Sequence, residues 1–389
     1  MNNDEKRKNR KKMIKRLLQA AVIIIAVLLA VNLCLTLFFT QKIPHRYASA
    51  QEGKALLRSN TDYYSNFTQN DLEFRMKKVG ATMDELLDAS TGEIRDYSFF
   101  EKYFIDHEIA KMAIKLLWNG YELPEIDKIV FIKTDMSVEM GNSGYTHGTQ
   151  IYLNSGFVTI NSILGIFPGF SKFFDELLWH EYFHCLSRCN PAFREKMYSL
   201  IHFTVADSDF ELPPSVLERY ISNPDVEHHD AYATFIIDGQ QIDCFAAWIT
   251  KTDYAQIPLG EDSDTEVVLV PIDGSDTYYT REQASNFDAV FGTNTGYVID
   301  PEECMADNFA YAMFYGMKGK DGNGYPNPEI IQGVIDAVSR SLRKEAYSYH
   351  KVMQIQVRGG TLHENTVPVL HTNEYNERDH GKHCQNHRR

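Results

Sequence analysis

The chain has 389 residues, of which 43 % are hydrophobic and 12 % aromatic, and this composition excludes an intrinsically disordered protein. Its formal net charge is −14 at pH 7. Eight of its 39 basic residues lie among the first 16, so the rest of the chain carries 31 basic and 51 acidic residues, a balance of −20. Such an acidic protein is repelled by a phosphate backbone, and nucleic acid is excluded as a partner.

The N-terminus has the pattern of a membrane anchor. A basic segment, residues 1–16, precedes an apolar run of 23 residues, 17–39, which is long enough to cross a bilayer as a helix. The basic segment would remain in the cytoplasm, so we predict a single-pass protein with its main domain outside the cytoplasm. The alternative is cleavage near Ala50, which would release a secreted protein starting at Gln51. The apolar run is longer than is usual for a cleaved signal peptide, and we favour the anchor.

Three further segments follow the apolar run. Residues 40–60 are polar and mixed in composition and are interpreted as a stalk. Residues 61–363 are long enough for one large extracytoplasmic domain. Residues 364–389 are mostly polar, and we predict a disordered tail. The six cysteines are too few to form the disulfide framework of a chain this long.

The first half of the domain contains helical and strand patterns. Apolar spacing predicts helices over 71–87 and 99–118, and the second should stop at Asn119-Gly120. Residues 128–133 indicate a short buried strand, and residues 145–154 indicate a further strand. At the edge of a sheet, the latter strand would pair with the backbone of a bound peptide. An ordinary sheet strand is the alternative.

The segment 173–188 carries the strongest chemical signal. Its apolar spacing predicts a helix, and it contains an H-E-x-x-H pattern, His180-Glu181-Tyr182-Phe183-His184. Residues four apart share a helix face, so His180 and His184 would present two imidazoles to one zinc ion. Glu181 is the expected general base. A chance occurrence of the pattern is the alternative.

A β-rich stretch of about residues 205–290 then interrupts the metal site. A helix is expected before this stretch, over 191–204, and another within it, over 215–221. Alternation over 230–249 with Gly239-Gln240 at its centre predicts a β-hairpin, and 266–272 indicates a third strand. We interpret this stretch as an insertion between the two halves of the site.

A third metal ligand is expected after the insertion. Pro301 followed by acidic residues predicts the start of a helix, on which Glu303 and Asp307 share a face. Glu303 is the predicted third ligand, and Asp307 would accept a hydrogen bond from a ligand histidine. Glu302 is the rival ligand, but it lacks an acidic residue four positions later.

With His180, Glu181, His184, Glu303 and Asp307, the chain resembles the gluzincin class of zinc metallopeptidases. Two segments, 223–225 and 297–303, are also similar to those of membrane-anchored bacterial HExxH proteins of unassigned activity. The resemblance implies an α+β zincin fold, with a mixed sheet, an edge strand, an active-site helix and a third-ligand helix. It also implies one Zn²⁺ per chain and hydrolysis of peptide bonds in a protein or peptide substrate by metal-activated water.

One catalytic role and two rival functions remain open at this stage. Tyr297 is the first candidate for a hydrogen-bond donor to the oxyanion, with His228, His229 and Tyr232 as alternatives. One rival function is a cell-surface binding protein with a structural or vestigial zinc, in which a cysteine next to a ligand, Cys185 or Cys304, closes the site. The other is a zinc hydrolase acting on a non-peptide amide.

Overall fold

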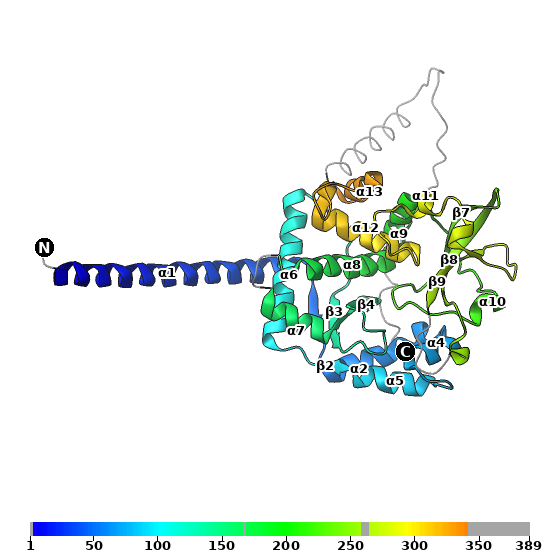
Figure 1. Cartoon of the computed structure of the whole chain (residues 1–389), viewed down its shortest axis with the longest axis horizontal. Helices are drawn as coiled ribbons and strands as arrows, with labels where there is room; N and C mark the ends of the chain where they lie inside the picture. The colour runs from blue at the N-terminus through cyan, green and yellow to red at the C-terminus, as the bar shows by residue number, and fades with distance from the viewer. Residues whose placement is uncertain (1–2, 166–168, 258–263, 341–389) are drawn as a thin grey trace, which may run out of the picture.

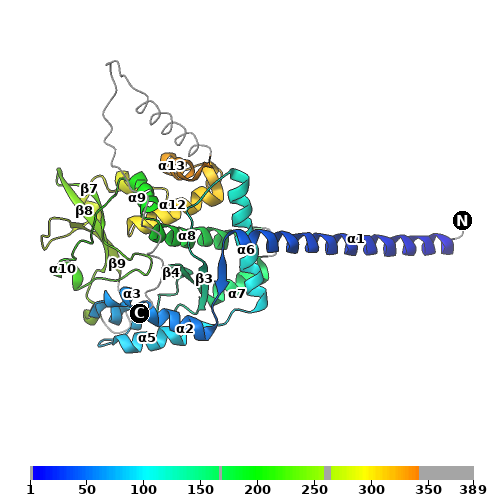
Figure 2. The ribbon, with the colours of Figure 1, turned by 180° about the vertical axis from the view of Figure 1, so that it is seen from behind.

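The computed structural model describes residues 3–165, 169–257 and 264–340 (Figure 1). A long helix, α1 (Asn3–Phe39), projects from one end of an α+β domain. The same domain seen from behind has its β7–β9 strands at the end opposite α1 (Figure 2). The tail predicted over residues 364–389 lies outside the described residues.

A mixed five-stranded sheet forms the centre of the domain. Parallel strands β1 (His45–Tyr47), β3 (Ile129–Thr134) and β5 (Gln150–Asn154) lie in that order, and β4 (Gly144–His147) pairs antiparallel with β5 at the edge. The short β2 (Ile94–Arg95) pairs antiparallel with β3. The strand predicted over 128–133 is thus confirmed. The segment 145–154 forms a hairpin of two strands, because Gly148 adopts a positive φ of 56° between them.

Both faces of this sheet are buried, which explains the uninterrupted apolar run of β3. Phe131, Ile151 and Leu153 face a core shared with the helices α6, α8 and α12. Val130 and Ile132 face a second core, shared with α2 and α5. The helices and the short turns of 3-10 helix have these bounds: α2 (Ala50–Ser59), α3 (Thr61–Ser65), α4 (Gln69–Met76), α5 (Met83–Gly92), α6 (Phe99–Asn119), α7 (Ser155–Leu164), α8 (Lys172–Cys189), α9 (Pro191–Tyr198), α10 (Pro214–Leu217), α11 (Phe287–Phe291), α12 (Pro301–Tyr315), α13 (Pro328–Val338), η1 (Thr40–Lys42), η2 (Ser199–Ile201), η3 (Tyr254–Gln256), η4 (Arg281–Gln283) and η5 (Gly316–Lys318).

The interpretation of residues 40–60 as a stalk is wrong, because this segment belongs to the domain. Ile43 is 3 % exposed in the main core, and β1 pairs with β3 along its length. One polar side chain of the segment is paired within the protein, since His45 Nε2 lies 2.9 Å from Asp106 Oδ1. Others, such as Gln41, Lys42 and Lys54, are exposed, so polar composition did not distinguish a stalk from the outer face of a folded segment.

Helix boundaries differ from the predictions in two places. The helix predicted over 71–87 is divided into α4 and α5, because Lys77 ends α4 in the left-handed region and Thr82 starts a new capping box. By contrast, α6 ends at Gly120 as predicted. The helix expected over 191–204 is shorter, and its last turn is the 3-10 helix η2.

A separate antiparallel sheet lies where the β-rich insertion was expected. Its strands, in spatial order, are β10 (Tyr279–Thr280), β9 (Thr265–Pro271), β8 (Gln240–Thr250), β7 (Ala231–Ile237) and β6 (Thr204–Val205). The predicted hairpin is confirmed as β7 and β8, and the third strand as β9. Asp238 and Gly239 make the hairpin turn with positive φ angles of 49° and 78°.

Candidate metal centre

Two adjacent helices, α8 and α12, carry the predicted metal ligands. Pro301 stands in the first turn of α12, and the Asp300 carboxylate accepts a hydrogen bond of 2.7 Å from the Glu302 N–H. Phe309 of α12 packs against Trp179 and Phe183 of α8, with ring centroids 6.1 and 5.4 Å apart. These aromatic contacts fix the histidine face of α8 against the acidic face of α12.

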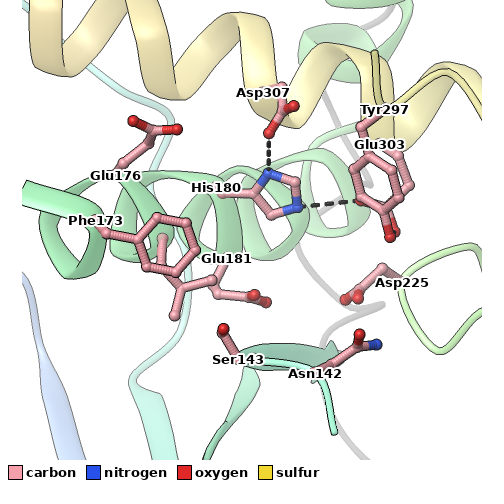
Figure 3. Close-up of a pocket in the computed structure, with 12 residues that line it drawn as sticks. Asn142, Ser143, Phe173, Glu176, His180, Glu181, Asp225, Tyr297, Glu303 and Asp307 are labelled. Carbon is pink, nitrogen blue, oxygen red and sulfur yellow. Dashed lines mark hydrogen bonds and ion pairs between the residues drawn. The ribbon is translucent and has the colours of Figure 1, made fainter. Parts of the chain in front are cut away.

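His180, His184 and Glu303 converge as the sequence predicts. Figure 3 shows His180 and Glu303 of this group. Glu303 Oε2 lies 3.1 Å from His180 Nε2 and 3.5 Å from His184 Nε2. These separations are close to the edge of about 3.3 Å in a tetrahedron of zinc ligands 2.0–2.1 Å from the ion. His184 Nε2 is buried and has no hydrogen-bond partner. The group could therefore hold a metal ion.

The outer nitrogen of each histidine is held by a carboxylate. His180 Nδ1 lies 2.9 Å from Asp307 Oδ1, and His184 Nδ1 lies 2.9 Å from Glu302 Oε1. With Nδ1 donating to a carboxylate, Nε2 of each ring carries the lone pair that can bind a metal ion. Glu302, the rival ligand of the sequence analysis, lies behind His184 and not in the ligand group.

Glu302 is also fixed from its other side. It is 4 % exposed, and Tyr198 donates a hydrogen bond of 2.5 Å to its Oε2. Ser187 donates to Oε1, the oxygen that faces His184. Three donors on two helices, α8 and α9, thus hold one carboxylate. The sequence did not predict that Glu302 would contact Nδ1 of His184, because a sequence does not show in which directions two neighbouring acidic side chains point on a helix.

Glu181 lies between the histidines and the edge of the mixed sheet. Its side chain is buried, and its Oε2 has no hydrogen-bond partner. Gly144, the first residue of β4, allows this position, since a β-carbon there would lie 2.5 Å from Glu181 Oε1. Burial, and then the charge of Asp225, raise the pKa of Glu181 to about 8.

The loop 223–225 contributes two side chains for which the sequence indicated no role. Asn223 donates a hydrogen bond of 2.5 Å to Glu303 Oε1 and so orients the predicted third ligand. Asp225 Oδ1 lies 4.0 Å from His184 Nε2 and accepts hydrogen bonds from the N–H and hydroxyl of Thr146. Figure 3 shows the Asp225 carboxylate turned into the cavity. The resemblance of this segment to other HExxH proteins was the sole signal, and it gave no role.

Tyr297 lies at the site, and the alternative oxyanion donors do not. Its hydroxyl is 3.2 Å from Glu303 Oε1, and its ring stacks on His180 with centroids 6.1 Å apart. His228 pairs with Asp209, and His229 lies 2.8 Å from the Tyr220 hydroxyl. Neither histidine, nor Tyr232, lines the cavity.

The cysteines next to the ligands take no part in the metal group. Cys185 is buried, and burial raises the pKa of its thiol above the ordinary range. The Cys304 thiol donates to the Phe291 carbonyl at 3.5 Å. Within residues 3–165, 169–257 and 264–340, neither candidate metal group contains a cysteine.

The charges around the site match a bound cation. Burial alone would lower the pKa of His184, but Asp225, Glu302 and Glu303 raise it to about 10. Burial opposes ionisation of Glu303, yet the hydrogen bond with His180 and the charge of the neighbouring His184 hold its pKa far below the ordinary range. The surrounding carboxylates thus favour positive charge at the two imidazoles, and a divalent cation would supply that charge.

The site opens into a cavity of about 180 Å³ (Figure 3). Asn142, Ser143 and Gly144 form its wall on the side of the sheet, and Phe173 and Leu177 of α8 form an apolar part of its lining. Comparison with family models, curated proteins and solved structures found no match for the chain. The fold and the site thus define an α+β protein with a buried His–His–Glu group that could hold one metal ion.

Proposed function

We propose that the protein is a membrane-anchored zinc metallopeptidase of the gluzincin type, with a zincin-like domain outside the cytoplasm. One observation carries the proposal. Two buried atoms without hydrogen-bond partners, His184 Nε2 and Glu181 Oε2, belong to residues of the two candidate metal groups, and Glu181 lines one cavity with His180 and Glu303. An unpaired ligand atom beside an unpaired carboxylate oxygen is the arrangement that metal-assisted hydrolysis requires.

Each residue has a distinct role in the proposed reaction. His180, His184 and Glu303 hold one Zn²⁺, which when bound supplies a Lewis acid that polarises the scissile carbonyl and activates water. Glu181 accepts the proton of the attacking water and delivers it to the leaving amine. The Tyr297 hydroxyl donates to the carbonyl oxygen as negative charge develops on that atom.

A peptide substrate is supported by the edge strand beside the cavity. The outward backbone groups of Gly144 adjoin Glu181, where an extended peptide would add to the sheet. The next N–H groups along this edge are occupied, because Thr146 donates to Asp225 and Gly148 donates to Glu227. Pairing would therefore be confined to the Gly144 end of β4.

The anchor is supported over a cleaved signal by the structure around residue 50. The helix that could cross a membrane covers Asn9–Lys42. Cleavage near Ala50 would remove β1 from the sheet and Ile43 from the core. It would also require a peptidase to reach Ala48, which is 4 % exposed. A secreted form starting at Gln51 would thus lose part of its own fold.

Glu181→Gln tests the proposed activity, because glutamine keeps the shape of the side chain and removes the base. Turnover of a broad peptide library should fall by roughly 10²–10⁴-fold, the usual contribution of a general base. Zinc content by elemental analysis should stay near that of the wild type. His184→Ala is the control that should lose zinc and activity together. A zinc-loaded wild type that cleaves no peptide would overturn the proposal.

A structural zinc site remains the second candidate, and Asp225 is the observation that favours it. Its Oδ1 lies 4.0 Å from His184 Nε2, so a small shift would bring a fourth protein ligand to the metal. A structural site is closed in this way, whereas a catalytic site keeps one open position. The effect of Asp225→Asn on zinc affinity distinguishes a structural site from a catalytic one.

A further inference from the structure

Helices α6 and α7 lie at the end of the domain from which α1 emerges (Figure 1), and both expose large apolar side chains. Four lie at the two ends of α6, with exposed fractions of 77 % for Phe99, 74 % for Phe100, 68 % for Leu117 and 87 % for Trp118. On the neighbouring helix α7, Ile160 and Ile163 are exposed by 54 % and 62 %. We call these six residues the apolar end face. A soluble surface seldom places so many large apolar residues on two adjacent helices.

The last turns of α1 pack against α6 between the two groups of exposed residues (Figures 1 and 2). The Tyr103 hydroxyl donates to Asn32 Oδ1 at 2.9 Å, and Asn32 Nδ2 lies 3.3 Å from His107 Nε2. Thr36, one turn later, is 2 % exposed. From Asn32 onward, α1 is therefore part of the domain, with the ends of α6 projecting on either side of it.

The length of the free apolar run places α6 at the membrane boundary. Residues 17–31 are the apolar part of α1 that precedes the contact with α6. At a rise of about 1.5 Å per residue they span roughly 22 Å, whereas the hydrocarbon core is about 30 Å thick. The remaining thickness has to come from residues that already contact α6. The bilayer surface then meets α6 itself, because no stalk separates the domain from the membrane.

We propose that the apolar end face docks on the surface of the lipid bilayer. This inference rests on the membrane anchor of the proposed function. Aromatic side chains such as Phe99, Phe100 and Trp118 are enriched at the boundary between hydrocarbon and water, where the anchor would place them. The domain then rests flat on the membrane, held by α1 at the centre and by apolar residues on both sides.

The docking depends on apolar contact and not on anionic lipid. Two of the three lysines of α6 have polar partners: Lys111 Nζ lies 2.7 Å from Asp175 Oδ1, and Lys115 donates to the Phe314 carbonyl. The third, Lys102, lies over the Tyr47 ring, with Nζ 5.7 Å from the ring centroid. Outside the basic N-terminus the chain has a net charge of −20. Zwitterionic lipid should therefore be sufficient, and added salt should not release the face.

Tryptophan fluorescence tests the contact, because Trp118 is one of three tryptophans and is far more exposed than Trp179, which is 1 % exposed. The third, Trp248, lies on β8 in the sheet opposite α1. The full chain is reconstituted into phosphatidylcholine vesicles with or without bromine on the lipid chains, near the headgroup. Brominated lipid should quench the emission of the wild type and of Trp248→Phe, and Trp118→Phe should lose this quenching.

Vesicle flotation separates failure of the anchor from failure of the docking. A protein that does not float with the vesicles would overturn both. A protein that floats while brominated lipid leaves its Trp118 emission unchanged would overturn the docking alone and leave the anchor intact. Circular dichroism of Trp118→Phe should match the wild type, since the side chain is 87 % exposed.

Discussion

Glu302→Gln is the sharpest test of how the metal centre is built. The Glu302 carboxylate accepts hydrogen bonds from His184 Nδ1–H at 2.9 Å, from Ser187 and from Tyr198. Glutamine has a single acceptor oxygen for these three donors, and its NH₂ group would meet another donor. The ring of His184 would lose the partner that directs Nε2 to the metal.

The expected loss can be stated for both metal binding and folding. Removing a carboxylate partner of a ligand histidine typically lowers metal affinity 10- to 100-fold, which is about 1.4–2.7 kcal/mol. A buried donor left unpaired near Ser187 or Tyr198 would cost a further ~1–3 kcal/mol of folding stability. Zinc affinity is measured by competition with a fluorescent chelator, and stability by denaturant unfolding of the metal-free protein.

Asp300→Asn is the matched control for Glu302→Gln. Asp300 is also a buried acid at the start of α12, but it accepts from the Glu302 N–H and contacts neither ligand histidine. Asparagine still caps the helix, so zinc affinity should remain within a few-fold of the wild type. Equal zinc affinity in Glu302→Gln and the wild type would refute the reasoning, as would an equal loss in the two variants.

Three further predictions concern the cavity and the surrounding fold. Gly144→Ala should displace Glu181, since a β-carbon would lie 2.5 Å from its Oε1. Peptide turnover should then fall about tenfold or more, while the zinc content stays the same. Turnover equal to that of the wild type would contradict this prediction. Asp225→Asn should leave zinc affinity nearly unchanged if the site is catalytic, whereas a loss above about tenfold by chelator competition would favour a closed structural site. Burial opposes ionisation of Glu101, but hydrogen bonds from Lys133 and other donors lower its pKa from 4.5 to about 2. A lowered carboxyl pKa adds folding stability above pH 4.5, and this stability is lost as the pH falls towards 2. Lys133→Gln should therefore lower the free energy of unfolding at pH 6 and make it fall less between pH 4.5 and 2, as measured by denaturant titrations.

The local patterns that were predicted correctly depend on short stretches of chain. The H-E-x-x-H spacing placed two histidines on one face of α8, because helical periodicity acts within a single turn. Pro301 and Asp300 fixed the start of α12, and Gly120 fixed the end of α6, through backbone chemistry that involves a few neighbours. The β7–β8 hairpin followed from alternation and a glycine turn.

Some interpretations failed because composition does not report which partner a polar residue finds. The segment 40–60 is polar, yet its histidine pairs with Asp106, 61 residues away, and its backbone joins the central sheet. A stalk and a polar strand with internal partners have similar sequences. Long-range pairing distinguishes them, and a single sequence does not display it.

The sequence by itself determined the metal chemistry that is available: two imidazoles on one helix, an acid between them and further acids at the start of a second helix. The tertiary structure decided which carboxylate does what, by turning Glu303 towards Nε2 of both histidines and Glu302 towards Nδ1 of His184. It also brought Asp225 from a loop into the cavity. The physical reason is that helix spacing is set by local backbone geometry, whereas the direction of a buried acid is set by the donors that folding brings around it.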